Sequence, residues 1–222
     1  MELFPIGTLN SSNSTGTYGS FAEPNKNCSH NVVHTSLVSQ MESNVLVTRK
    51  KAERSHIFTY SYENIWAREF LQIEKFFNSV YGRVTSFYLA DLSRMQRASL
   101  SLGSGNYTVT YGGTLSSFET SYYTTTEGEG GQYVFVWDAA GLKFRLGKIA
   151  TINTGVSVVF PDATDYGSLV AGTTPIVACP VYRVYFGQDQ LNAEPGEFNP
   201  SDDADGGFMY SLDISFTQYG TK

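Results

Sequence analysis

The feature that most constrains the fold of this chain is its one convincing amphipathic helix. Large apolar residues recur at helical spacing and are Trp66, Phe70, Ile73 and Phe77. Steps of four, three and four residues place these side chains on one stripe. Asn64 is positioned to cap the start of the helix, and Gly82 is positioned to end it. A helix with a single apolar stripe has to bury that stripe, so the pattern predicts a sheet beneath it.

Strands are expected on both sides of this helix. Before it, Phe58, Tyr60 and Tyr62 alternate with smaller residues and therefore share one face of a strand. After it, residues 84–89 read as another strand, which Asp91 closes. The unit from 57 to 92 is thus strand, helix, strand.

Beyond this unit the chain consists of short β-like runs separated by glycine-rich turns. The expected strands cover residues 44–48, 107–111, 133–137, 143–146, 156–160, 181–186 and 211–216. The chain contains 15 Tyr, 15 Phe and 21 Gly, which suit pleated surfaces and turns. We expect a mostly β fold, a β-sandwich or barrel-like sheet with one amphipathic α-helix packed against it.

The chain divides into three expected segments. Residues 1–40 are predicted to be a polar N-terminal arm, because the tract 8–31 is rich in Ser, Asn, Thr and Gly and has few apolar residues to order it. This tract is either a mobile terminus or an arm that orders against a neighbouring subunit. Residues 41–94 plus 181–222 are predicted to form the core sandwich with the helix, and 95–180 a β-rich insertion or second subdomain.

Charge and hydropathy exclude some classes of partner. The net charge of −6 disfavours a nucleic acid, because a phosphate backbone requires a basic patch. The longest apolar runs are far shorter than the roughly 20 residues that span a bilayer, and no signal peptide precedes them. We therefore expect that the protein is made in the cytoplasm and does not insert into a membrane. Cys28 and Cys179 belong to no multi-cysteine motif, which predicts free thiols.

Residues with catalytic or metal-binding chemistry are sparse. The common nucleophile, phosphate-loop and zinc-protease motifs do not occur, so we expect no enzyme and no cofactor. Cys28, His30 and His34 offer a thiolate and two imidazoles, which is an incomplete zinc set without a recognised spacing. We interpret them as incidental polar residues and expect no metal.

Two acidic stretches are weaker candidates. The segment from Ser201 resembles the opening of a calcium loop, but Leu212 stands where the closing Glu is expected. Glu127 and Glu129 lie between glycines, which would not hold a carboxylate pair rigidly enough for acid–base work. Both stretches are expected to be surface loops.

Two separated segments share features with a known family. In residues 54–92 a basic residue precedes an aromatic strand, a helix ending in a pair of phenylalanines, a Gly-Arg link and a strand ending in an acid. The positions are Phe76, Gly82, Arg83, Phe87 and Asp91. A second segment over 181–191 carries Arg183, Phe186 and Asp189. The pattern resembles the small tail proteins of phages and gene-transfer agents that are related to distal tail and minor tail proteins.

This resemblance implies a function in assembly rather than catalysis. Distal tail proteins of this family form a sixfold ring that joins the tail tube to the tip or baseplate hub. The expected partners are therefore further copies of the chain, in a homo-hexamer, together with the tube protein and the hub or tip proteins in the tail of the virion. Alternatives are another tail or neck subunit, such as a tube, terminator or head–tail joining protein, or a carbohydrate-binding β-sandwich.

Overall fold

The computed structural model describes residues 2–4, 7–8, 24–33, 36–40, 46–50, 55–113, 117–126, 130–138, 143–162, 166–173, 176–198 and 207–218. Up to residue 94 its elements are β1 (Glu2–Phe4), β2 (Gly7–Thr8), β3 (Asn27–Val33), β4 (Ser36–Gln40), β5 (Leu46–Lys50), β6 (Ser55–Trp66), α1 (Ala67–Ser79), β7 (Phe87–Ala90) and the 3-10 turn η1 (Leu92–Arg94). Then follow β8 (Gln96–Gly103), β9 (Asn106–Tyr111), the 3-10 turn η2 (Thr120–Tyr122), β10 (Tyr133–Asp138), β11 (Lys143–Lys148), β12 (Thr151–Asn153), β13 (Ser157–Pro161), β14 (Tyr166–Gly167), β15 (Ile176–Phe186), β16 (Ala193–Phe198) and β17 (Phe208–Gln218).

One large sheet of 15 strands runs through the molecule, and α1 is the only α-helix of the described residues. The pairing is antiparallel except between β1 and β7. The prediction of a mostly β fold with one amphipathic helix on a sheet is confirmed.

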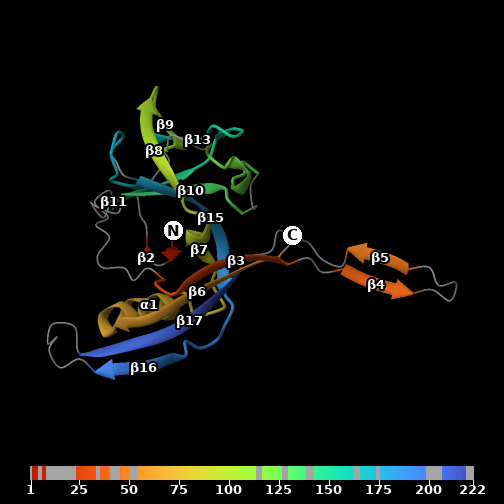
Figure 1. Cartoon of the computed structure of the whole chain (residues 1–222), viewed down its shortest axis with the longest axis vertical. Coiled ribbons are helices and arrows are strands. Elements are labelled where there is room, and N and C mark those ends of the chain that lie inside the picture. Colours follow the sequence, from red (N-terminus) through yellow and green to blue (C-terminus); the bar gives the residue numbers. More distant parts are fainter. Residues whose placement is uncertain are drawn as a thin grey trace.

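Strand β15 connects two lobes. Its first residues pair with β8 and β10, and its last residues pair with β7 and β17. We call the described residues within 2–33, 55–94 and 182–218 the helix lobe, and those within 95–181 the hairpin lobe. Figure 1 shows the helix lobe below and the hairpin lobe above, with β15 passing between them.

The helix lobe has an aromatic core. Strand β17 lies between β6 on one side and β15 and β16 on the other, and β3 pairs with the far edge of β6. Phe4 of β1 lies fully buried at the centre, with ring centroids of five other aromatic residues 5.1 to 6.5 Å away. These rings belong to Tyr60, Phe76, Phe87, Phe186 and Phe216. The core therefore joins both ends of the described chain.

The hairpin lobe is built from neighbouring strands. Strands β8 and β9, β10 and β11, and β12 and β13 each pair as consecutive elements. A separate apolar cluster fills this lobe and draws all its members from residues 98–178. A smaller cluster at the junction includes Leu3, Ala90 and Phe135. The predicted division into 41–94 plus 181–222 and 95–180 stays a prediction. Each lobe has an apolar cluster of its own, and the smaller cluster joins the two lobes.

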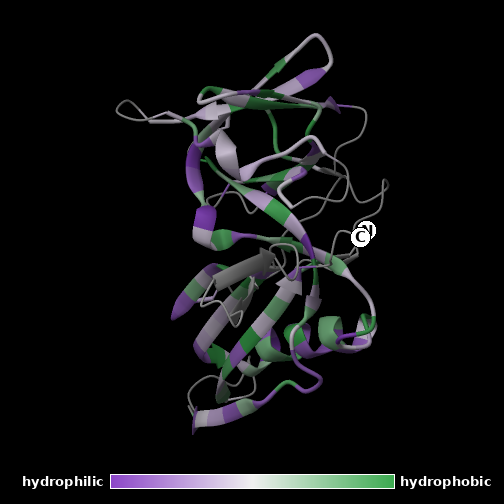
Figure 2. Cartoon of the chain, turned by 90° about the vertical axis from the view of Figure 1, so that its right-hand side faces the viewer, coloured by the Kyte–Doolittle hydropathy of each residue, from purple (hydrophilic) through white to green (hydrophobic). Residues whose placement is uncertain are grey.

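The helix begins and ends at different residues from those expected. It starts after Trp66, whose N–H donates to the Glu69 carboxylate at 3.0 Å. Asn64 does not cap it, because this residue lies within β6 at φ 55°, beside a bulge in the pairing with β17. At the other end α1 stops at Ser79, before the expected Gly82, whose N–H donates to the Phe77 carbonyl at 3.0 Å. Figure 2 shows hydrophobic and hydrophilic residues alternating around α1.

Each expected strand occurs, but the bounds differ. The strand expected over 84–89 is shorter than predicted: β7 begins at Phe87, because residues 81–84 form a turn in which the Val84 N–H donates to the Tyr81 carbonyl at 3.3 Å. Strands β5, β6, β7, β9, β10, β11, β13, β15 and β17 match the runs anticipated from sequence. The prediction of a loop or arm over 8–31 is wrong for 27–31, because β3 pairs there with β6 in register from Asn27 opposite Ser61. Residues 9–23 lie outside the described residues. Leu3 and Phe4, placed by sequence in the polar arm, are buried.

A two-stranded ribbon stands apart from the large sheet. Strands β4 and β5 pair only with each other, in register from Ser36 opposite Lys50 to Gln40 opposite Leu46. The ribbon is inserted between β3 and β6, and Figure 1 shows it projecting sideways from the body. Two-stranded ribbons are marginally stable by themselves.

Candidate functional site

The two segments that carry the family resemblance lie side by side. Strands β7 and β15 pair antiparallel, with Phe87 opposite Val184 and Ala90 opposite Val181. Arg83, from the link after α1, lies 3.5 Å from the carboxylate of Asp189, which follows β15. Arg183 donates from its Nε to the Ser86 hydroxyl at 2.9 Å. Charged positions far apart in sequence thus meet on one surface of the helix lobe.

The apolar motif positions meet inside the same lobe. Phe186 lies 4.8 Å between ring centroids from both Phe77 and Phe87. Phe76 packs edge-on against Phe87 at 5.1 Å. Gly82 has φ +60°, and a Cβ there would stand 3.0 Å from the Phe77 ring. These positions specify packing between α1, β7 and β15.

The predicted helix stripe is close to the buried face but not identical with it. Ile73 and Phe76 are buried, whereas Phe70 and Phe77 are half-buried against the core. Phe70 stacks on Tyr210 of β17 at 4.7 Å. Trp66 ends β6 and is half-buried. The sequence stripe omitted Phe76, which the resemblance had singled out for a different reason.

Asp91 occupies a different environment from the other motif positions. Its side chain is fully buried where β7 ends at the junction with the hairpin lobe. One carboxylate oxygen, Oδ1, accepts from the N–H and the hydroxyl of Ser93, at 3.1 and 2.6 Å. The other, Oδ2, lies 2.7 Å from Nδ1 of His30. The two atoms do not meet the geometric criteria of a hydrogen bond, so the contact is a close approach of the imidazole and the carboxylate.

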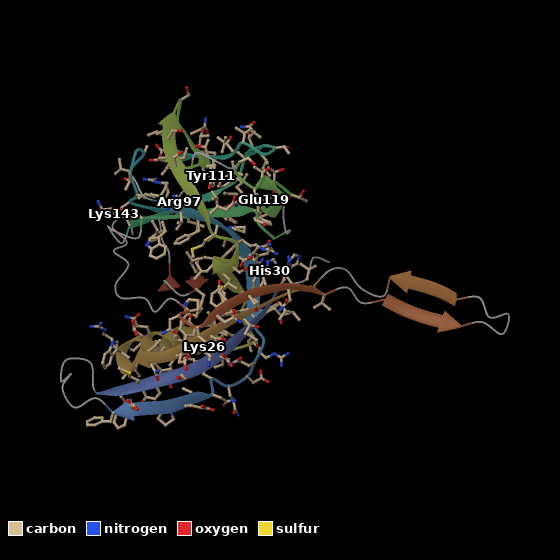
Figure 3. The ribbon with its side chains drawn as sticks, viewed as in Figure 1. Lys26, His30, Arg97, Tyr111, Glu119 and Lys143 are labelled. Atoms are coloured by element: carbon tan, nitrogen blue, oxygen red, sulfur yellow. The ribbon has the colours of Figure 1, made fainter. Side chains whose placement is uncertain are left out.

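A second imidazole extends this pair. His30 Nε2 lies 2.6 Å from Nδ1 of His56, which gives one hydrogen bond whose donor depends on the tautomers. The His30 ring stacks on Phe58 at 4.4 Å and meets the edge of Tyr182 at 5.2 Å. We call Asp91, His30 and His56 the Asp–His–His chain. Figure 3 labels His30 on the side of the molecule from which the ribbon projects.

Protonated thiols and phenols surround the Asp–His–His chain. Burial, with a smaller contribution from Asp91, raises the pKa of the Cys28 thiol to about 12. Burial likewise raises the pKa of Tyr60, Tyr182 and Cys179. The Tyr60 hydroxyl donates to the Ala90 carbonyl and accepts from the Leu92 N–H at 3.1 Å. Since the thiolate is the nucleophilic form, Cys28 is not activated for attack at neutral pH.

The candidate metal and acidic sites are only partly described. Cys28 and His30 lie on one strand, while His34 falls outside the described residues. Among the residues with described side chains, no three His, Cys, Asp or Glu are grouped to hold a metal ion. The calcium-like segment 201–206, Glu127 and Glu129 also lie outside the described part. Over the described chain, no helix has the length and apolar character needed to cross a membrane.

An open polar groove of about 360 Å³ lies on the helix lobe. Its lining residues are Lys26, Tyr62, Gln188, Gln190, Asn192, Glu194, Ser211, Leu212 and Asp213. Gln188 is fixed by accepting from the Ser215 N–H at 3.1 Å and donating to the Asp213 carbonyl at 3.3 Å. Tyr62 is almost wholly buried, so its ring is not a platform on which a sugar could stack.

Sequence reasoning missed the Asp–His–His chain as a unit. His30 was assigned to a flexible arm, and His56 was passed over at the start of an aromatic strand. The available signal was alternation: Cys28, His30 and Val32 fall on one face if 27–33 is a strand. The pairing of that strand with β6 is long-range, and the sequence carries no local mark of it.

Comparison with known proteins adds no family to this description. No family model matches the chain, and no curated protein matches it.

Proposed function

We propose that this chain is a structural subunit of a phage tail, the distal tail protein whose copies form a ring joining the tail tube to the tip. The proposal begins from the resemblance of 54–92 and 181–191 to that family. Both segments contribute to one packed unit, in which the rings of Phe77 and Phe87 each contact Phe186. A motif made of packing residues suits a building block better than a catalyst.

The observation that carries the assembly function is the β4–β5 ribbon. It forms a sheet of its own and projects from the body (Figure 1). Because an isolated two-stranded ribbon is marginal in water, a projecting one gains stability when it lies on a second surface. A neighbouring copy supplies that surface in a ring, where each subunit presents a different patch to the next.

The sheet edges offer such patches. Among the described residues, β16 pairs only with β17 and β3 only with β6, so each has one open edge. Strand β16 carries Pro195 between Glu194 and Glu197, residues that discourage strand addition. Strand β3 has no proline or acidic residue and runs directly into the ribbon. We infer that β3 and the ribbon form one assembly surface.

Ring formation is tested with the purified chain and a ribbon-deleted variant. Val33 and Ser55 are paired neighbours at the root of the ribbon, so a short Gly-Ser turn can replace residues 34–54 without parting β3 from β6. Negative-stain images and light scattering should show sixfold rings for the full chain and a folded monomer for the variant. A full chain that stays monomeric at high concentration, and virions that lack the protein, would contradict the proposal.

The position in the tail is a separate proposal. Immunogold labelling of particles should mark the tail tip, and purified tube and hub proteins should bind the ring. Labelling along the tail or at the neck would favour a tube, terminator or joining subunit instead. The alternative of a carbohydrate-binding module gains no support from the tyrosine-rich segments, since Tyr107 and Tyr123 are buried in the hairpin lobe.

A further inference from the structure

Strand β1 fills a site that other parts of its own chain form. Leu3 and Phe4 are wholly buried, and they pair with Tyr88 and Leu89 in the one parallel pairing among the described strands. Five aromatic rings surround Phe4, and Leu3 packs in the cluster at the junction of the lobes. We call the edge of β7, together with these surroundings of Leu3 and Phe4, the β1 site. Figure 1 shows β2, the partner of β1, where the two lobes meet.

Little in the local chain connectivity assigns β1 to this particular site. Among the described residues β2 pairs only with β1, so the pairing of β1 with β7 is what joins these two strands to the sheet. Parallel strands are not joined by a tight turn, and no short connection therefore determines which copy of β7 receives β1. The fit depends on the side chains of Leu3 and Phe4, which every copy of the chain carries.

The connection from β2 to β3 is long enough to reach a neighbouring copy. The Asn25 side-chain amide donates to the Glu63 carbonyl at 2.6 Å, which places Asn25 beside β6. Residues 9–24 join Thr8 to this point, and a fully extended segment of that length spans about 55 Å. The polar tract 8–31 was expected to be either a mobile terminus or an arm that orders against a neighbouring subunit, and this length satisfies the second expectation.

We propose that in the ring the β1 site of each copy holds β1 of the adjacent copy. Because the copies are identical, exchange preserves the contacts of Leu3 and Phe4, and its cost is low. Copies held side by side present β1 to the adjacent site at a high effective concentration. Exchange in one direction around the ring then links each subunit to the next. Since the second copy is a ring neighbour, this exchange rests on the proposed function.

Two introduced thiols reveal which chain fills the site. Leu3 and Tyr88 are register partners and pack in the same cluster, so Leu3→Cys and Tyr88→Cys place thiols across the β1–β7 pair. The full-length double variant is oxidised with copper–phenanthroline, denatured and separated on a gel without reductant. Exchange joins different chains and should convert most of the protein into a ladder of covalent oligomers that ends at the closed ring. A site filled by the chain's own β1 should give monomers with an internal disulfide.

A matched pair in a hairpin controls for chance oxidation between chains. Ser101 and Thr108 are register partners on β8 and β9, which a short turn joins. The double variant Ser101→Cys with Thr108→Cys should therefore give monomers only. The natural thiols Cys28 and Cys179 are present in both variants, so mass analysis of proteolytic fragments identifies which sulfur atoms are joined.

A second measurement avoids substitutions at the buried site. If the variant with Leu3→Cys does not fold, isotope-labelled and unlabelled copies of the unchanged chain are refolded together. Isotope-filtered NMR spectra should then show cross-peaks between the Leu3 methyl groups of labelled chains and the Tyr88 rings of unlabelled chains. Absence of these cross-peaks from mixed rings would overturn the exchange.

The outcomes separate the exchange from ring formation. Rings in negative-stain images that give only monomers on the denaturing gel would overturn the exchange and leave the ring intact. Covalent dimers without larger species would support exchange between two copies and contradict the ring. Monomers both in solution and on the gel would overturn both proposals.

Discussion

The helix lobe draws its core from three separated parts of the chain, whereas the hairpin lobe draws its core from one. Phe4, residues 58–92 and residues 182–216 supply the first core, and residues 98–178 supply the second. In the helix lobe Phe58 of β6 pairs with Phe216 near the C-terminus. In the hairpin lobe β8 and β9 are joined by a turn at Ser104 and Gly105.

This difference concerns folding order as well as packing. Local hairpins close short loops, whereas pairing the two ends of a chain requires a large loss of entropy before any contact forms. We expect the hairpin lobe to form first and the helix lobe to close when β17 and β1 arrive. Strand β15 belongs to both lobes, so once the hairpin lobe has formed, the end of β15 is already positioned to pair with β17.

The largest expected effect comes from removing the ring that connects the ends of the chain. Phe4→Ala leaves a cavity among five aromatic rings and should lower the free energy of unfolding by about 3–5 kcal/mol. Denaturant titration measures it, with Phe198→Ala as the control, because Phe198 is 56% exposed. Hydrogen exchange should show β17 losing protection before β9. Equal losses in the two strands would contradict separate closure of the lobes.

A smaller effect is expected from the buried cation of the hairpin lobe. Arg145 donates from Nε to the Leu169 carbonyl at 2.8 Å and stacks over Tyr107 at 4.2 Å. Arg145→Met leaves that carbonyl without this donor, so unfolding should become easier by about 1–3 kcal/mol. Lys143→Met, at an exposed position of the same strand, is the matched control. An unchanged midpoint for Arg145→Met would mean that water replaces the guanidinium.

The two lobes also differ in what could be read from sequence. The helix and its aromatic neighbours were predictable, because Phe70, Ile73 and Phe77 carry a local 3.6-residue period. The hairpin strands were predictable for a similar reason, since glycine-rich turns separate β-branched runs. The boundaries of these strands were harder to predict. Strand β15 begins at Ile176 instead of the expected 181, because Pro180, a residue that usually ends a strand, lies within it.

The contributions that sequence did not reveal are those made over long distances. Phe4 sits in a short apolar segment before a polar tract, and nothing local marks it as the centre of the core. His30 and Asp91 are similar, because their contact depends on β3 lying beside β6. The buried face of α1 shifted towards Phe76 since β1 inserts Phe4 there. Local periodicity carries no information on which distant segment covers a face.

Glycines in the two lobes allow strain and crowding to be separated. Gly82 and Gly105 have φ +60° and +74°, so an alanine at either position is strained by about 1–2 kcal/mol. At Gly82 the added Cβ also meets the Phe77 ring at 3.0 Å, whereas at Gly105 it meets nothing within 4 Å. Thermal unfolding should therefore show a greater loss for Gly82→Ala than for Gly105→Ala. Equal losses would show that Phe77 yields without cost.

The smallest expected effect on stability belongs to the exposed pair Arg83 and Asp189. Their side chains are 56% and 75% exposed, so water and salt screen the 3.5 Å contact. A double-mutant cycle of Arg83→Ala and Asp189→Ala should give a coupling energy below about 1 kcal/mol. Both residues are nevertheless positions of the family motif. Because their contact contributes little to stability, a role in assembly is the one left to test. If the Arg83→Ala variant is fully stable but does not form rings, the pair lies in the subunit interface. If the variant forms normal rings, the pair remains exposed to solvent in the assembly.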